Sequence, residues 1–343
     1  AAKRSPGIAN KGQPGPKAEG EPDVFTKGSK AKALLVTPVA ASAFSAENVT
    51  FSAGVVLMLL HAALGATQLY SPENVAKISP EPCFARDSCL LLVRFNGLFQ
   101  AVMVSVIWNL LEAFKNNTGS KAPNGRSLVS LVAWGAGQLA ALYANPSGWA
   151  PSNYLGAVAI AALLSVVYGL VLFQRTQKNG LLSLLAVQPA MKRMVPQGVV
   201  SMGYLSTMGC SLIAGYELLA EAEWAESEIF PPAFHNQFNK LMLRQAGASL
   251  MALAPILLAL KAAHEQQCIW KTNYKNLNFG VAAVFGGLSW ILGIATSADL
   301  VRITLTTQGL LWASAVSGFM AAYHYMYAED PSAPSAEAAS ESS

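Results

Sequence analysis

The side chain best suited to chemistry in this sequence is that of His61, which lies at the centre of a long apolar segment, next to Leu60. An ionisable or ligating residue inside a membrane span is a functional candidate by default. Gly65, one helical turn further on, leaves a flat space beside the imidazole. This space suits a chlorophyll whose magnesium is bound by the imidazole and whose ring lies against small residues. The alternative interpretation is a histidine that is hydrogen-bonded to a neighbouring helix.

Other polar side chains lie within or near the ends of apolar segments. Each could hold a cofactor, but bridging two helices is the more common role of such residues in membranes. His264 and His324 lie near segment ends, where an imidazole is either an interfacial ligand or solvated. The remaining candidates of this kind are Gln100, Asn109, Glu112 and Gln138.

Two arginines 150 residues apart carry a repeated motif, because Arg94-Phe-Asn-Gly97 superposes on Arg244-Gln-Ala-Gly247. Each arginine either extends to the lipid headgroups or points inward and clamps a ligand group between helices. Gly97 and Gly247 would let a neighbouring helix or a flat ligand approach closely. Together with the pattern of spans, the motif predicts a parallel tandem duplication of a four-helix unit.

The elements that must position these residues are eight apolar segments, each predicted to be a membrane-spanning helix. A span needs about 20 apolar residues, and lipid offers the backbone no external hydrogen-bond partner, which favours helices. The predicted spans are residues 51–70, 90–114, 128–143, 155–174, 198–219, 241–260, 279–297 and 305–327. The predicted fold class is an all-α integral membrane protein with eight transmembrane helices and extended terminal tails.

The composition agrees with a membrane protein and excludes other classes. The chain is 53% apolar and only 12% charged, with a mean hydropathy of +0.36. A soluble domain carries about 25% charged residues, so a soluble enzyme is excluded as the leading interpretation. The net charge of +4 is too small to indicate a nucleic-acid partner.

Five regions follow from the segments. Residues 1–50 form a basic tail rich in Pro and Gly, predicted to be extended or disordered. Residues 51–180 form the first four-helix repeat, 181–197 an interfacial linker, 198–327 the second repeat, and 328–343 an acidic disordered tail. The first residue is Ala rather than Met, for which a cleaved targeting sequence is the simplest explanation.

The charges of the loops predict an orientation. With eight spans, the basic tail and every loop rich in Lys and Arg fall on the side of the N-terminus, as the positive-inside rule requires. The acidic loop that contains Glu221, Glu223 and Glu226 falls on the opposite side. Both termini are therefore expected on the same side of the membrane.

The cysteines and the known catalytic motifs predict no reaction. The four cysteines lack the spacing of a zinc or iron–sulfur site. Cys83 and Cys89 share a loop on the side opposite the N-terminus, where a disulfide is expected if that side is oxidising. The sequence contains no phosphate-binding loop, dinucleotide fingerprint or zinc-protease motif. We therefore do not expect an enzyme.

A multi-span chain with a long Pro/Gly/Lys tail and no catalytic motif resembles an accessory subunit of a large energy-converting membrane complex. It most resembles the lineage-specific subunits of photosystem I–antenna supercomplexes in algae with complex plastids, through the tail 1–50, the multi-span core and His61. Its four-helix unit with the Arg-x-x-Gly motif is also loosely similar to the DoxX-like membrane proteins, whose functions vary. The paired Glu/Arg signature of light-harvesting antenna helices is absent from this sequence.

The photosystem resemblance implies a non-catalytic subunit that bridges core and antenna. It implies a few bound chlorophylls and carotenoids, structural lipids, and contacts with other membrane subunits and the bilayer. It also implies a plastid thylakoid location with both termini in the stroma. The residues implied as chlorophyll ligands are His61 first, then Gln100, Asn109, Gln138 or Gln308, with His264 as an interfacial candidate.

Two other classes stay open. A supernumerary subunit of a mitochondrial respiratory complex, in the inner membrane, would have the same tails and spans but no pigments. A small-molecule transporter or DoxX-like protein would use a cavity between the two halves, lined by Arg94 and Arg244.

Overall fold

The structure is a computed structural model that describes residues 46–76, 86–116, 122–144, 153–176, 195–232 and 235–329. Within these ranges the regular elements are helices, which confirms the all-α class. The eight long helices described are α2 (Ala46–Tyr70), α4 (Arg86–Lys115), α5 (Ala122–Tyr143), α6 (Asn153–Thr176), α9 (Val199–Ala220), α11 (Gln237–Glu265), α12 (Thr272–Ser297) and α13 (Leu305–Tyr327). Two short helices, α3 (Pro72–Ala76) and α10 (Ala222–Ile229), follow α2 and α9.

Six helices among the described residues are long and apolar enough to cross a membrane, as expected for an integral membrane protein. They are α2, α4, α6, α9, α11 and α12. Helices α5 and α13 cover the third and eighth predicted spans but do not belong to this group. Polar side chains such as Arg126 and Gln138 in α5, and Gln308 and His324 in α13, lower the mean hydropathy of these two helices.

Several helices begin earlier than the apolar segments that predicted them. Helix α2 starts at Ala46, inside the predicted tail, and α5 starts at Ala122 rather than at residue 128. Hydropathy marks only the apolar part of a helix, whereas the backbone continues into a polar first turn. In α11 that turn is capped by Asn236, whose side chain accepts a hydrogen bond from the backbone N–H of Asn239 at 2.7 Å.

Most of the predicted tails and linker lies outside the described residues. These parts are residues 1–45, 181–194 and 330–343. The C-terminal end of the second predicted repeat lies within the described residues. Helix α13 ends at Tyr327, which is the predicted end of the last span.

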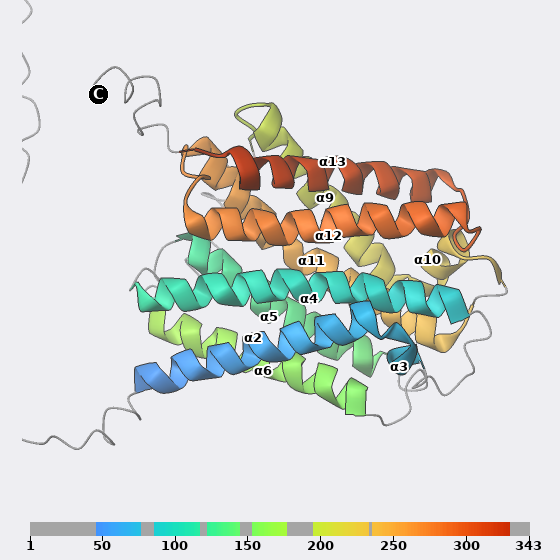
Figure 1. Cartoon of the computed structure of the whole chain (residues 1–343), viewed down its shortest axis with the longest axis horizontal. Helices are drawn as coiled ribbons and strands as arrows, with labels where there is room; N and C mark the ends of the chain where they lie inside the picture. Colours follow the sequence, from blue (N-terminus) through green and yellow to red (C-terminus); the bar gives the residue numbers. More distant parts are fainter. Residues whose placement is uncertain are drawn as a thin grey trace, which may run out of the picture. The chain divides into compact units, whose positions relative to one another are not determined.

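In the unit that contains residues 46–329, the long helices form two layers (Figure 1). One layer has the order α13, α12, α4, α2, and the other has the order α9, α11, α5, α6. Neighbours within each layer are in contact, and α4 contacts α11 and α5 across the layers. Each layer therefore combines two helices from the first half of the chain with two from the second half.

Glycines allow the closest helix crossings. A Cβ atom on Gly97 of α4 would lie 2.9 Å from the Cβ of Gln68 on α2, and one on Gly65 would lie 3.4 Å from the carbonyl oxygen of Gly97. A Cβ on Gly247 of α11 would lie 2.6 Å from the carbonyl oxygen of Gly215 on α9. The close helix approach predicted at both Arg-x-x-Gly motifs is therefore present, because only a hydrogen side chain leaves room for it.

Candidate functional site

His61 lies on α2 with both ring nitrogens bonded to other helices. Its Nδ1 donates to the side-chain oxygen of Gln100 on α4 at 2.7 Å, and its Nε2 lies 3.1 Å from the hydroxyl of Ser165 on α6. The ring packs edge-on against Trp134 of α5, with 4.7 Å between ring centroids. His61 is fully buried. This cluster joins four helices of the first half through a single imidazole.

The cluster does not fit a chlorophyll at His61. A magnesium ligand needs an unshared nitrogen lone pair and an open space in front of it. Both nitrogens of His61 have side-chain partners, and its neighbours Gln100 and Ser165 are themselves buried. The geometry supports the alternative interpretation, in which His61 is hydrogen-bonded to neighbouring helices.

The buried amides predicted as ligands or bridges also connect helices. The amide nitrogen of Gln138 on α5 donates to the carbonyl oxygen of Gln245 at 2.9 Å and to the hydroxyl of Ser249 at 3.0 Å, both on α11. The amide nitrogen of Asn109 on α4 donates to the carbonyl oxygen of Asn273 on α12 at 2.7 Å. These bonds cross between the first and second halves of the chain, so the side chains hold the two halves together.

Sequence reasoning missed several residues that do the same work. Asn96 of α4 donates to the carbonyl oxygen of Met242 on α11 at 3.0 Å, and Ser130 of α5 donates to that of Ala252 at 2.6 Å. Trp134 donates from its indole nitrogen to the hydroxyl of Ser249 at 3.1 Å. A polar residue inside an apolar segment was the usable signal for Asn96, which stands within the Arg94-x-x-Gly97 motif.

The structure does not bring the two motif arginines together. Arg94 is exposed, and Arg244 is half-buried and donates to the carbonyl oxygen of Ala144 at 2.9 Å. Neither side chain lines the apolar cavity described below. The two glycines of the motifs instead lie at separate helix crossings, α2 with α4 and α9 with α11.

His264 belongs to a cluster of rings and charges at the C-terminal ends of α11 and α13. Its ring lies 5.3 Å from that of His324, which stacks on Tyr204 of α9 at 6.0 Å. In the preceding turn of α11, Lys261 forms an ion pair with Glu265 at 2.7 Å, and the side chain of this lysine is 1% exposed. Gln308 is exposed and lies in the first turn of α13, whereas His324 lies in the last turn of the same helix. Gln308 therefore does not belong to this cluster.

Glu226 of α10 is a buried carboxyl outside the spanning helices, with an exposed fraction of 1%. Its Oε1 accepts a hydrogen bond from the backbone N–H of Asn236 at 2.8 Å. Burial raises the pKa of Glu226 above its usual value, and this hydrogen bond offsets part of the rise. The carboxyl of Glu226 is therefore packed inside the protein, whereas the Glu223 side chain of the same helix is exposed.

The described cysteines and acidic groups form no metal site. Cys89 is bonded in a disulfide, whereas Cys210 and Cys268 are free. Cys83 lies outside the described residues, so its pairing with Cys89 stays a prediction. In the part of the chain that the structure describes, no three His, Cys, Asp or Glu side chains are grouped to hold a metal ion.

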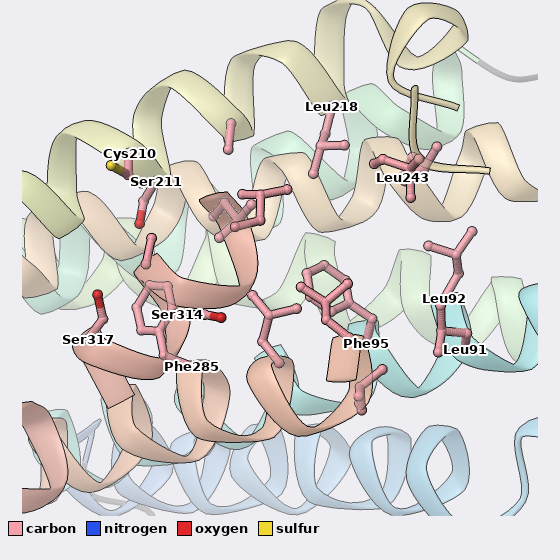
Figure 2. Close-up of a pocket in the computed structure, with 18 of the residues that line it drawn as sticks. Leu91, Leu92, Phe95, Cys210, Ser211, Leu218, Leu243, Phe285, Ser314 and Ser317 are labelled. Atoms are coloured by element: carbon pink, nitrogen blue, oxygen red, sulfur yellow. The ribbon is translucent and has the colours of Figure 1, made fainter. Parts of the chain in front are cut away.

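An apolar cavity of about 90 Å³ lies among the helices of the second half (Figure 2). Its walls come from α9, α11, α12 and α13, with α4 and the end of α10 closing it. Leucine and phenylalanine side chains make up most of the lining, for example Phe95, Leu218 and Phe285. Four residues with hydroxyl groups also line it, Thr207, Ser211, Ser314 and Ser317, but nearly all of its surface is carbon. The cavity lining carries no charge, so it can accept only a neutral, mostly apolar group.

No protein-family model matches the chain, and no curated protein matches it in sequence.

Proposed function

We propose that this chain is a non-catalytic accessory subunit of a photosystem I–antenna supercomplex, in which it bridges core and antenna. The observation that carries a structural role is the use of the buried polar side chains. His61, Gln138 and Asn109 all have partners on other helices of the chain. These hydrogen bonds stabilise the arrangement of the helices, which is a structural role. The photosystem assignment itself is supported by the resemblance of the tail and the multi-span core.

The proposal includes eight spans built by tandem duplication, which matched helix ends support. Pairs of ends lie 150 residues apart: α2 and α9 end at Tyr70 and Ala220, α4 and α11 end at Lys115 and Glu265, and α5 and α12 begin at Ala122 and Thr272. Helix contacts match in the same way. The pair α2–α4 corresponds to α9–α11, α5–α6 to α12–α13, and α5–α11 to α12–α4.

Reciprocal close contacts between the halves support the duplication further. A Cβ atom on Gly137 of α5 would lie 2.7 Å from the Cβ of Ala248 on α11. One on Gly287 of α12 would lie 2.6 Å from a methyl carbon of Leu98 on α4. Both members of the first contact are 150 residues from their counterparts in the second. Two copies of one unit, related by a two-fold axis along the helices, would produce such a reciprocal pair of contacts.

Orientation and location complete the proposal. The even number of spans would place both termini in the stroma, with the loop that contains Glu223 and Glu226 in the thylakoid lumen. The basic loops on the stromal side support this orientation. Two of the predicted pigment ligands are compatible with a chlorophyll at the protein surface, because Gln308 is exposed and His264 is half-buried. Carotenoid and structural lipid would bind along the apolar helix faces.

Separation of native membrane complexes tests the assignment. Membranes solubilised in mild detergent are resolved by size, and the chain is located with an antibody against residues 330–343. We expect it to migrate with a pigmented complex whose absorption spectrum and mass-spectrometric inventory identify photosystem I. Co-migration with a pigment-free respiratory complex would instead establish the mitochondrial alternative. Migration as a free monomer or dimer with saturable binding of a soluble ligand would favour a transporter.

A further inference from the structure

The cavity of the second half occupies the place that corresponds to the His61 cluster of the first half. Ser211 stands 150 residues after His61, and Leu250 stands 150 residues after Gln100. Both Ser211 and Leu250 line the cavity. In the first half, the imidazole and the amide fill this place and bond to each other at 2.7 Å. In the second half, a smaller side chain at Ser211 leaves the space open.

One hydroxyl in the cavity wall has no hydrogen-bond partner. Thr207 and Ser317 are bonded to each other at 2.7 Å, and Ser314 is bonded to Ser289 at 2.8 Å. Ser211 is 3% exposed, and its Oγ has no hydrogen-bond partner among the residues that the structure describes. Figure 2 shows Ser211 on α9 with its hydroxyl directed toward the space between α9 and α13, across from Ser317. A buried, unpaired hydroxyl costs free energy, so this position favours a ligand that supplies the missing partner.

A single water molecule does not satisfy this position well. A buried water needs two to four polar partners. The other three hydroxyls of the wall already bond to protein, and the rest of the lining is almost wholly carbon. Apolar cavities of this kind stay dry and bind apolar molecules. An apolar ligand with one polar atom matches the lining better than solvent does.

The cavity adjoins a groove on the outer surface between α9 and α13, and the two are separated by side chains that they share. Thr207, Cys210, Ala313 and Ser317 line both the cavity and this groove. Exposed apolar side chains form the outer part of the groove, including Met202 of α9 and Trp312 of α13, which are 56% and 69% exposed. Such side chains face lipid in a membrane protein. A molecule that passes the shared side chains into the cavity would therefore come from the bilayer and not from water.

We propose that this site binds one slender lipid-soluble molecule, an acyl or isoprenoid chain that carries a hydroxyl or carbonyl group. The chain enters from the bilayer between α9 and α13, and its polar group hydrogen-bonds with Ser211. A chlorophyll macrocycle is too wide for a cavity of about 90 Å³, whereas one end of a slender chain fits it. The proposal does not depend on which membrane complex contains the protein.

Photocrosslinking of the full-length protein in lipid nanodiscs tests the site. Two probes separate the possible sources of the chain: the methyl ester of a 16-carbon fatty acid, which is uncharged and has a carbonyl group, and a farnesol-type isoprenoid alcohol, each with a diazirine near its end. Peptide mapping should locate saturable crosslinks on α9 and α13, and excess unlabelled compound should compete them away. Reaction with the ester alone assigns an acyl lipid, and reaction with the alcohol alone assigns an isoprenoid. Reaction with both probes shows that the site binds slender chains of either chemical type.

Three variants connect the crosslink to the cavity. Ser211→Leu fills the space and should reduce saturable crosslinking at least tenfold. Ser211→Ala keeps the space but removes the hydroxyl and should weaken competition about fivefold, the usual effect of one hydrogen bond. Ser52→Leu makes the same substitution at an exposed position of α2 and should change nothing. Unsaturable labelling spread over all exposed helices, or unchanged labelling in both Ser211 variants, would overturn the proposal.

Discussion

The Nδ1 atom of His61 lies 2.7 Å from the side-chain oxygen of Gln100, and both side chains are buried between α2 and α4. The same imidazole contacts α6 through Ser165 and α5 through Trp134. A residue that a sequence marks as a cofactor ligand therefore serves to join four helices. Buried polar networks of this kind give a helix bundle one preferred arrangement when every member is satisfied.

His61→Leu should reduce the free energy of unfolding by about 2 kcal/mol, because it leaves the Gln100 oxygen buried without a donor. Unfolding in mixed detergent micelles measures this change. Gln308→Leu is the control, since Gln308 is exposed on α13 and should have little effect on stability. The pigment content of the native complex should be the same in the His61 variant. Loss of one chlorophyll at unchanged stability would restore the ligand interpretation of His61.

Gly247→Ala should destabilise the protein by about 2 kcal/mol, because the new methyl group would lie 2.6 Å from the carbonyl oxygen of Gly215. Helices α9 and α11 would have to separate, and the loss should appear as a lower melting temperature. The matched control is Gly209→Ala on α9, where the methyl group meets no atom within 4 Å. This control should be neutral or slightly stabilising, because alanine favours a helix over glycine. Equal melting temperatures for the two variants would argue against close packing at Gly247.

Glu265→Gln should cost about 3 kcal/mol, because it leaves the ammonium group of Lys261 buried without its counter-charge. The side chains of Lys261 and Glu265 are 1% and 12% exposed. The ion pair between Lys240 and Glu223 offers a matched comparison, since the Glu223 side chain is 77% exposed. Glu223→Gln should therefore cost less than about 1 kcal/mol. Denaturant midpoints of the two variants test whether Glu265→Gln destabilises the protein more than Glu223→Gln does. A larger loss of stability in Glu223→Gln would refute this prediction.

Stability should decrease as the pH rises through the raised pKa of Glu226. The pKa of this carboxyl is higher in the folded protein than in the unfolded chain. At a pH between these two pKa values, the folded state therefore binds more protons than the unfolded state. The contribution of Glu226 is most favourable below its usual pKa and is lost as the pH passes the raised value. Glu226→Gln keeps an acceptor for Asn236 and removes the titration. The difference in melting temperature between the two proteins should grow with pH, in favour of the variant, and a constant difference would exclude this assignment.

The positions of the long helices and of two close helix crossings could be predicted from the sequence. The long apolar segments located the eight long helices described, because burial of the backbone in lipid requires runs of that length and character. The Arg-x-x-Gly motifs also marked two close crossings, since Gly97 and Gly247 leave room for α2 and α9. The polar first turns were missed because they carry no hydropathy signal, as at the start of α5.

The sequence could not decide what the polar residues do. An isolated histidine in an apolar segment is compatible with a ligand and with a bridge, and only the positions of Gln100 and Ser165 distinguish the two. The same holds for the cavity at Ser211, because a small side chain leaves a void only if its neighbours on other helices do not fill it. The sequence by itself determined the helical class, the helix positions and the membrane character, which depend on local composition. Only the tertiary structure decided which helices meet, which polar groups are satisfied and where space remains, because these depend on contacts between segments far apart in the chain.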